Sequence, residues 1–192
     1  TFFFMKNLSD ELIWKSLKEG NIEAFEILFK NFYPRLFNYG LKISRDIVLT
    51  EDSLQDFFLY IYERRQNLSS LETIAPYLFS SYRRFIIKMI QKRKKSRMLR
   101  DLDKNMIDLQ FTPEEVITKQ EATSFREKNL TLILNKLPKR QREVIYLKYY
   151  CDLKTIEIAE VMEINYQSVV NTIHKAIKNL REDVSISHLL NS

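Results

Sequence analysis

Two groups of side chains in this 192-residue sequence have types and spacing that suit contacts with DNA. The first is a run of nine basic residues, with no acidic residue among them, from position 83 to position 100: Arg83, Arg84, Lys88, Lys92, Arg93, Lys94, Lys95, Arg97 and Arg100. A solvated helix face normally mixes positive and negative charges, so this run favours a nucleic acid as partner. A merely solvated face or a membrane surface are the alternatives.

Aromatic residues lie within and just before the basic run. Unpaired bases stack on aromatic rings while cations follow the phosphates, so this mixture suits single-stranded DNA. Tyr82 and Phe85 would serve equally well as core residues. The residues that form the mixture are Tyr77, Tyr82, Arg83, Arg84, Phe85 and Lys88.

The second group lies in TIEIAEVMEINYQSVVNTIHKAIKNL, residues 155–180, where two amphipathic runs are separated by a short break. The small Ala159 permits a close helix crossing, and Asn165 can cap the second helix. The pattern predicts a helix-turn-helix that reads the major groove, although any helical hairpin has similar apolar spacing. The predicted outer face presents Gln167, Ser168, Asn171, Thr172, Lys175 and Lys178.

Residues for independent catalysis are not apparent. His174 and His188 lack a carboxylate at a useful spacing, Cys151 has no nearby partner in sequence, and a phosphate-binding glycine-rich loop is missing. We therefore expect no enzyme activity, metal site, cofactor or small-molecule substrate. A single cysteine also excludes an intramolecular disulfide and suits a reducing cytoplasm.

The elements that carry these residues are predicted to be helices. Two glycines and four prolines leave few places for tight turns, so we expect an all-α fold. Helices are expected from Ser9 to Gly20, from Asn21 onward with Pro34 bending or dividing the run, and from Thr50 to Arg65. Residues 67–76 are expected to form a loop or broken helix before a helix over 77–100. No apolar run is long enough to span a bilayer.

A change in composition divides the chain into two predicted helical domains. Residues 101–111, DLDKNMIDLQF, lose helical periodicity and are expected to form a linker. Thr112, Pro113 and Glu115 have the pattern of a helix start, and Pro138 starts a later helix. The predicted domains are therefore residues 5–100 and 112–185, while residues 1–4 receive no function.

The two blocks together resemble a bacterial RNA polymerase sigma factor of the extracytoplasmic-function group, in the sigma-70 family. Residues 137–181, from LPKRQREVIYLKYY to HKAIKNLR, resemble its region 4. The segments GNIEAFEILFKNFYPRLFNYG and TEDSLQDFFLYIYERRQNL resemble its region 2. The resemblance implies a subunit that binds core RNA polymerase and directs initiation at a two-element promoter. A helix-turn-helix regulator that binds duplex DNA without the polymerase is the alternative.

The resemblance also implies a role for each group of residues. Core polymerase binding falls to Asp52, Gln55, Asp56 and Phe57, which are assigned to the family motif D-x-x-Q-[DE]-x-F. Recognition and melting of the −10 element fall to Tyr77, Tyr82, Arg83, Arg84, Lys88, Lys92 and Arg93. Recognition of the −35 element falls to Gln167, Ser168, Asn171, Thr172, Lys175 and Lys178. The implied partners are core polymerase, promoter DNA and, by resemblance only, an anti-sigma factor, all at a cytoplasmic location.

One departure from the family pattern concerns the turn of the predicted helix-turn-helix. Glu163 stands where the family usually has glycine. If the turn keeps a left-handed residue at this position, glutamate costs roughly 1 kcal/mol relative to glycine. Many members also carry cations where Val170 and Thr172 stand, and an arginine where Lys175 stands, which predicts fewer phosphate contacts from this helix.

Overall fold

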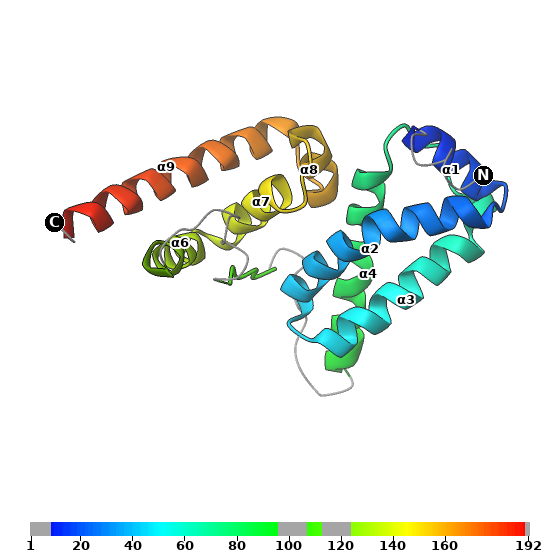
Figure 1. The fold of residues 1–192 in the computed structure, drawn as a ribbon, viewed down its shortest axis with the longest axis horizontal. Helices are drawn as coiled ribbons and strands as arrows, with labels where there is room; N and C mark the ends of the chain where they lie inside the picture. Colours follow the sequence, from blue (N-terminus) through cyan, green and yellow to red (C-terminus); the bar gives the residue numbers. More distant parts are fainter. Residues whose placement is uncertain (1–8, 96–106, 113–123, 191–192) are drawn as a thin grey trace. The chain divides into compact units, whose positions relative to one another are not determined.

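The computed structural model describes residues 9–95, 107–112 and 124–190, and the regular elements within these ranges are all helices (Figure 1). The helices form two compact units, one mainly from the chain before residue 103 and the other from the chain after it. The predicted all-α architecture with two small helical domains is confirmed. Among the described residues, no helix combines the length and apolar character needed to cross a membrane.

The first unit begins with two helices whose starts were predicted from their caps. In α1 (Asp10–Lys18), the Ser9 hydroxyl accepts a hydrogen bond from the amide of Leu12 at 3.5 Å. In α2 (Ile22–Ser44), the Asn21 side chain accepts from the amide of Ala24 at 3.1 Å. The helix α2 continues through Pro34 and is not divided there.

The next helices of the first unit begin earlier than predicted. The helix α3 (Ile47–Glu63) starts before Thr50 because the Asp46 carboxylate caps it, accepting from the amide of Leu49 at 3.0 Å. A short 3₁₀ turn, η2 (Arg65–Asn67), follows. The helix α4 (Ile74–Lys95) begins before Tyr77, since a helix accepts proline in its first turn and Pro76 lies there. Residues 96–100 of the predicted helix lie outside the described residues.

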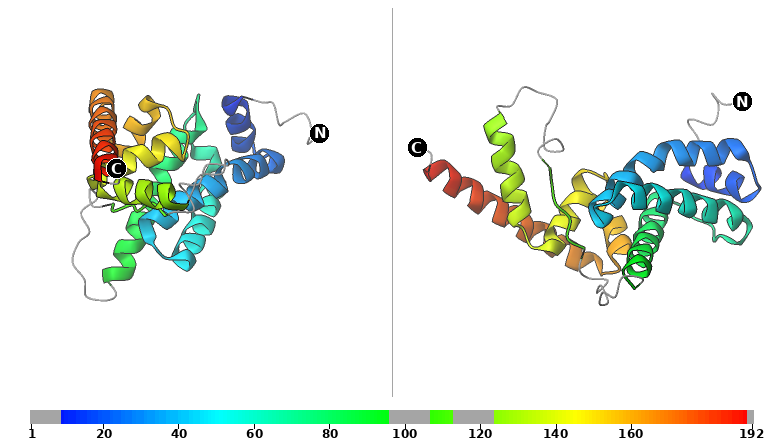
Figure 2. Two further views of the ribbon diagram at one scale, coloured as in Figure 1. Left: turned by 60° about the vertical axis from the view of Figure 1, so that its left-hand side comes forward. Right: turned by 90° about the horizontal axis from the view of Figure 1, so that it is seen from below.

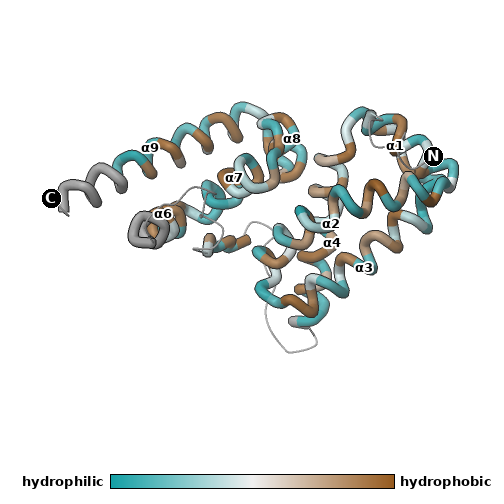
Figure 3. The backbone as a smooth tube through the Cα atoms, viewed as in Figure 1, coloured by the Kyte–Doolittle hydropathy of each residue, from teal (hydrophilic) through white to brown (hydrophobic). Residues whose placement is uncertain are grey.

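The core of the first unit forms where α2 packs against α3 and α4 (Figure 2). Apolar and polar residues alternate around these helices, as the hydropathy colouring shows (Figure 3). The closest approach is at Gly40 of α2, where an added Cβ would overlap the hydroxyl of Tyr82 from α4. That hydroxyl is hydrogen-bonded to Ser53 of α3 at 3.0 Å. Gly40 therefore permits three helices to meet around one buried tyrosine.

The second unit contains α6 (Ser124–Lys136), α7 (Lys139–Tyr149), most of α8 (Thr155–Met162) and α9 (Tyr166–Leu190). The helix α9 packs against both α6 and α7. Pro138 is the N-cap of α7, as its position in the sequence predicted. Residues 113–123, where a helix start was predicted, lie outside the described residues.

The end of the predicted linker is packed in the second unit. Ile107, Leu109 and Phe111 are buried, while the residues between them are more exposed. The side-chain amide of Asn135 holds the backbone of Phe111 from both sides, accepting from its N–H at 2.8 Å and donating to its carbonyl at 3.0 Å. Residues 107–111 are non-helical, as their lack of helical periodicity indicated, but they pack into the second unit with alternate residues buried, a period of two.

Candidate polymerase and DNA interfaces

One face of α3 carries an exposed polar surface. Asp52, Gln55 and Asp56 are exposed and lie three and four residues apart, which brings them to one side of the helix. Val48 and Leu59 extend this face in both directions and are 60% and 55% exposed. An exposed face with apolar ends and an acidic centre suits a protein partner that offers basic side chains between apolar ones.

Phe57, the fourth residue assigned to polymerase binding, lies in the core and is 1% exposed. Its ring contacts those of Tyr82 and Phe85 on α4, with centroids 5.3 and 5.7 Å away. Counted from Asp52, the last position of the motif falls on Phe58, which is also buried and packs against Phe29 of α2. The assignment of Phe57 to direct contact is therefore corrected: these rings hold α3 against its neighbours, and the residues between them face outward.

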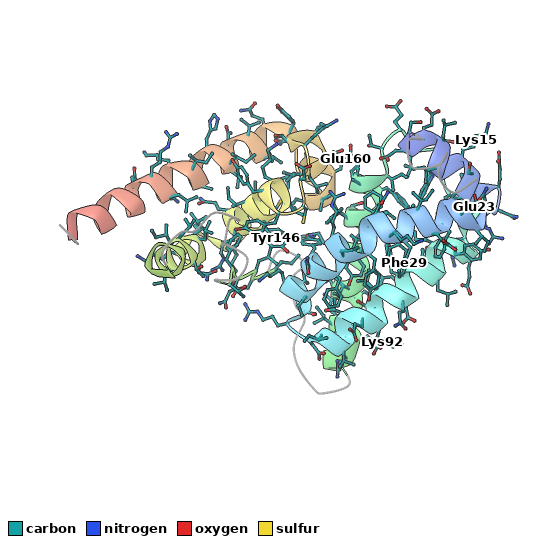
Figure 4. The ribbon with its side chains drawn as sticks, in the orientation of Figure 1. Lys15, Glu23, Phe29, Lys92, Tyr146 and Glu160 are labelled. Atoms are coloured by element: carbon teal, nitrogen blue, oxygen red, sulfur yellow. The ribbon has the colours of Figure 1, made fainter. Side chains whose placement is uncertain are left out.

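A groove of about 560 Å³ lies between α3 and α4. Four of the residues predicted to bind the −10 element line it together: Tyr77, Arg84, Lys88 and Lys92. The rings of Tyr60 and Phe85 form part of its wall, with centroids 6.4 Å apart. Figure 4 labels Lys92 near the end of α4 and Phe29 on α2. Cations beside aromatic rings in an open groove suit unpaired bases and their phosphates.

The structure does not bring Tyr82 or Arg83 into this groove. Tyr82 is fully buried and its hydroxyl bonds Ser53, so the core alternative holds for this residue. Burial raises the pKa of Tyr82, which keeps the hydroxyl neutral. Arg83 is 8% exposed, on the side of α4 away from solvent. Both residues are corrected from DNA contacts to residues of the helix packing.

Arg93 lies near the last turn of α4 and forms an ion pair with Asp46, the residue that caps α3, at 2.9 Å. The Arg93 side chain is 47% exposed, so this pair lies at the surface and contributes little to stability by itself. Its charge is nonetheless shared with a carboxylate. Lys88 and Lys92 are therefore better candidates for phosphate contacts than Arg93.

In the second unit, α8 and α9 form the predicted helix-turn-helix. Glu163 takes a left-handed conformation with φ of 54°, and the amide of Ile164 donates to the carbonyl of Ala159 at 3.0 Å. This is the Schellman arrangement, in which glycine is usual at the position of Glu163. Lys154 precedes α8 at the N-cap position, and the Glu157 carboxylate accepts a hydrogen bond from its amide at 2.6 Å.

The outer face of α9 begins at a capped end. The Asn165 side chain accepts from the amide of Ser168 at 2.7 Å, as its position predicted. Ser168 and Thr172 are half-buried and therefore lie at the margin of this outer face. The Thr172 hydroxyl donates to the carbonyl of Ser168 at 2.6 Å. The fully exposed members of the predicted set are Gln167, Asn171, Lys175 and Lys178.

Two residues of these surfaces, Tyr60 and His174, were not predicted from the sequence. Tyr60 lines the α3/α4 groove together with Phe85, which the sequence had offered either for unpaired DNA or for the core. His174 is exposed, and its spacing from Asn171 and Lys178 brings it to the same side of α9. The sequence reasoning had considered His174 only as a catalytic residue.

Comparison with known proteins gives matches over both units. Residues 127–180 match the model of sigma-70 region 4. RNA polymerase sigma factor SigV of Bacillus subtilis (strain 168) is 24% identical over 152 residues, covering 79% of this chain and 83% of SigV. ECF RNA polymerase sigma factor SigW of the same organism is 22% identical over 179 residues, covering 88% of this chain and 94% of SigW.

Two solved structures have a similar fold. CnrH, in complex with the cytosolic domain of CnrY, has a TM-score of 0.62 at 17% identity, covering 92% of this chain and 97% of CnrH. The sigma factor RpoE of Bartonella quintana, in complex with the anti-sigma factor NepR, has a TM-score of 0.58 at 16% identity, covering 86% of this chain and 99% of RpoE. The chain is therefore similar along both units to RNA polymerase sigma factors of the sigma-70 family, including relatives of the extracytoplasmic-function group.

Proposed function

We propose that the protein is a sigma factor that binds core RNA polymerase and directs initiation at promoters with −10 and −35 elements. The observation that carries this proposal is the combination of relatives that match along both units with three distinct surfaces in one chain. These surfaces are the acidic face of α3, the cationic aromatic groove between α3 and α4, and the polar face of α9.

Each surface receives a proposed partner. The α3 face, with Asp52, Gln55 and Asp56, binds core polymerase. The α3/α4 groove, with Tyr77, Arg84, Lys88 and Lys92, binds the −10 element as its strands separate. The outer face of α9 lies in the major groove of the −35 element, where side chains of an inserted helix reach base edges.

We propose that the protein has no enzyme activity of its own. Sigma factors are generally regulatory subunits without such activity, and the polymerase forms the bonds of the transcript. The cytoplasm, where polymerase and promoters meet, is the proposed location. An anti-sigma factor is a proposed regulator, supported by the complexes of CnrH with CnrY and of RpoE with NepR.

A regulator that binds duplex DNA without the polymerase is less well supported. Such a protein needs a helix-turn-helix but has no use for the groove between α3 and α4. SigV, SigW and SigX match the first unit as well as the second, and they are RNA polymerase sigma factors.

In vitro transcription tests the proposal. The purified protein is mixed with core polymerase and a library of genomic promoter fragments, and the 5′ ends of the transcripts are sequenced. We expect comigration with core in gel filtration and starts at a set of fragments that share two elements. Absence of both comigration and specific starts would overturn the proposal.

A further inference from the structure

Residues 68–73, which connect η2 to α4, are held at both ends by α1. The indole N–H of Trp14 donates to the carbonyl of Ser69 at 2.8 Å. The carboxylate of Asp10 accepts from the backbone amide of Ile74 at 2.9 Å, where α4 begins. These bonds join positions 55 and 64 residues apart in sequence.

The loop has few other contacts that would hold its shape. Ser69, Ser70, Glu72 and Thr73 are exposed. A hollow of about 490 Å³ separates part of the loop from α1, with Gln66 and Ser70 in its lining. Side-chain packing of the loop is limited to Leu68 and Leu71, which are half-buried, and the two hydrogen bonds from α1 restrain its two ends.

Trp14 also connects this loop with the α3/α4 groove. Its side chain is 1% exposed, and a buried indole N–H requires an acceptor, which the carbonyl of Ser69 supplies. The rings of Trp14 and Tyr77 meet edge to face, with centroids 5.3 Å apart. Tyr77 lines the groove, so one buried side chain contacts both the loop and a residue proposed to bind DNA.

Asp10 acts at two helix ends. It lies in the first turn of α1, where a carboxylate is favourable, and it also satisfies an amide at the start of α4. The first amides of a helix have no partner within the helix, so a carboxylate from another element fixes where that helix starts. Ile74 is buried, which fits a helix start that is held in place before any ligand binds.

We propose that Asp10 and Trp14 are positioning residues for the single-strand DNA site: by fixing residues 68–73 and the start of α4, they hold Tyr77 in its binding arrangement in the free protein. The proposal rests on the proposed function. A loop that is already ordered does not lose conformational entropy on binding, so these restraints increase affinity for unpaired DNA without touching it. Binding to core polymerase and to the −35 element does not depend on them.

The variants that test this inference remove a hydrogen-bonding group, and each is compared with a variant of similar size or charge that keeps the bond or never made it. Trp14→Phe keeps an aromatic ring beside Tyr77 but removes the N–H donor. Asp10→Ala removes the acceptor for Ile74, whereas Asp10→Asn keeps an oxygen that can accept and should rescue. Glu11→Ala is the matched control, because it removes an acidic side chain from the same first turn.

Holoenzyme assembled with each variant is titrated with a fork DNA, unpaired at the −10 element, of a promoter found by the transcription experiment. Loss of one hydrogen bond of about 1–2 kcal/mol corresponds to about 5- to 30-fold weaker binding, expected for Trp14→Phe and Asp10→Ala. The Asp10→Asn and Glu11→Ala variants, and binding of all variants to core and to a −35 duplex, should stay within about twofold of wild type. Wild-type affinity of Trp14→Phe for fork DNA would overturn the inference while leaving the sigma function intact.

A second measurement needs no variant, because Trp14 is the only tryptophan of the chain. Acrylamide quenching of its fluorescence is recorded for the free protein and after addition of the fork oligonucleotide. We expect shielding of Trp14 in both states. An accessible indole that becomes shielded only with DNA would mean that the DNA orders the loop, and would contradict the inference even if transcription succeeds.

Discussion

Glu163 occupies a backbone conformation that favours glycine, and it does so at the turn between α8 and α9. Its Cβ makes the left-handed conformation unfavourable by roughly 1 kcal/mol relative to glycine. We therefore expect Glu163→Gly to raise the free energy of unfolding by about 1 kcal/mol, measured by urea denaturation with circular dichroism.

Glu160→Gly is the matched control for this prediction. Glu160 is exposed within α8, where the backbone is helical and glycine lowers stability by about 1 kcal/mol relative to good helix formers. The two substitutions should thus change stability in opposite directions. If both variants are destabilised equally, strain at Glu163 is not the explanation.

Tyr82 gives the first unit a dependence on alkaline pH. Burial raises its pKa in the folded protein, while in the unfolded chain it ionises near pH 10. The folded state therefore binds more protons above pH 10, and its stability falls as the pH rises, by up to about 1.4 kcal/mol per pH unit from this group. Denaturation at pH 8 to 11 should show a smaller fall for Tyr82→Phe than for wild type.

The control for Tyr82 is Tyr166→Phe, which removes a hydroxyl from a side chain that is 51% exposed. This variant should follow the wild-type dependence on pH. At pH 8 Tyr82→Phe should be less stable by about 1 kcal/mol, because Ser53 keeps its hydrogen bond to the carbonyl of Thr50 but loses the one to Tyr82. An identical alkaline fall for wild type and Tyr82→Phe would assign the effect to other groups.

At the scale of elements, the helices were predictable from caps and apolar spacing wherever both were present. Ser9 and Asn21 mark the starts of α1 and α2, and Asn165 marks the start of α9. The acidic residues after Thr50 favour a helix start there, whereas Asp46 caps α3 earlier. A proline favours a break before α4, but the first turn of this helix accepts Pro76.

The segment 107–112 was harder to predict, because its partners are distant in sequence. Asn135 satisfies the backbone of Phe111 across 24 residues, and Arg142 pairs with Asp108 across 34. Neither contact leaves a local pattern. The alternation of Ile107, Leu109 and Phe111 was visible, but alternation over five residues does not reveal the surface that covers them.

The exposed cations of α4 should dominate the dependence of DNA binding on salt. Lys88 and Lys92 line the groove and are exposed, whereas Arg83 is buried and Arg93 is paired with Asp46. Each phosphate contact that is lost lowers the slope of log K against log salt by about 0.7 on single-stranded and 0.9 on duplex DNA. Replacing Lys88 and Lys92 together with alanine should therefore lower the slope by roughly 1.5.

Fluorescence anisotropy of fork DNA with holoenzyme, at several salt concentrations, measures this slope. Lys30→Ala supplies the control, since Lys30 is an exposed lysine of α2 that forms an ion pair with Glu26 at 3.3 Å. Its slope should equal that of wild type. An unchanged slope for the double variant would show that DNA does not follow the α3/α4 groove.

For the whole molecule, the sequence was sufficient to predict two helical domains and their family, but not which site residues face solvent. Tyr82, Arg83 and Phe57 have the residue types expected at a DNA or protein interface. The three lie in the core because α2, α3 and α4 meet there, with Gly40 permitting the approach of Tyr82. Burial depends on this meeting of three helices, and a pattern along one helix does not determine it.

The residues proposed to bind polymerase differ from those proposed to bind DNA. We therefore predict that a substitution can weaken polymerase binding and leave DNA binding unchanged. Asp52 and Gln55 are exposed on α3, away from the groove residues of α4, and neither side chain supports the core. Replacing both with alanine should weaken binding to core polymerase by about tenfold or more, the effect of removing contacts worth about 1.4 kcal/mol or more at the centre of an interface. The circular dichroism spectrum and binding of the −35 duplex should not change.

Binding is measured by competition for labelled core polymerase, with Glu63→Ala as the control. Glu63 is an exposed acid at the end of the same helix, so its loss alters the charge of α3 as much as the loss of Asp52. If the interface is specific, the double variant weakens binding far more than Glu63→Ala does. If the attraction is only electrostatic, each variant weakens binding in proportion to the charge that it removes. Equal effects would mean that the acidity of α3, and not the positions of Asp52 and Gln55, attracts the polymerase.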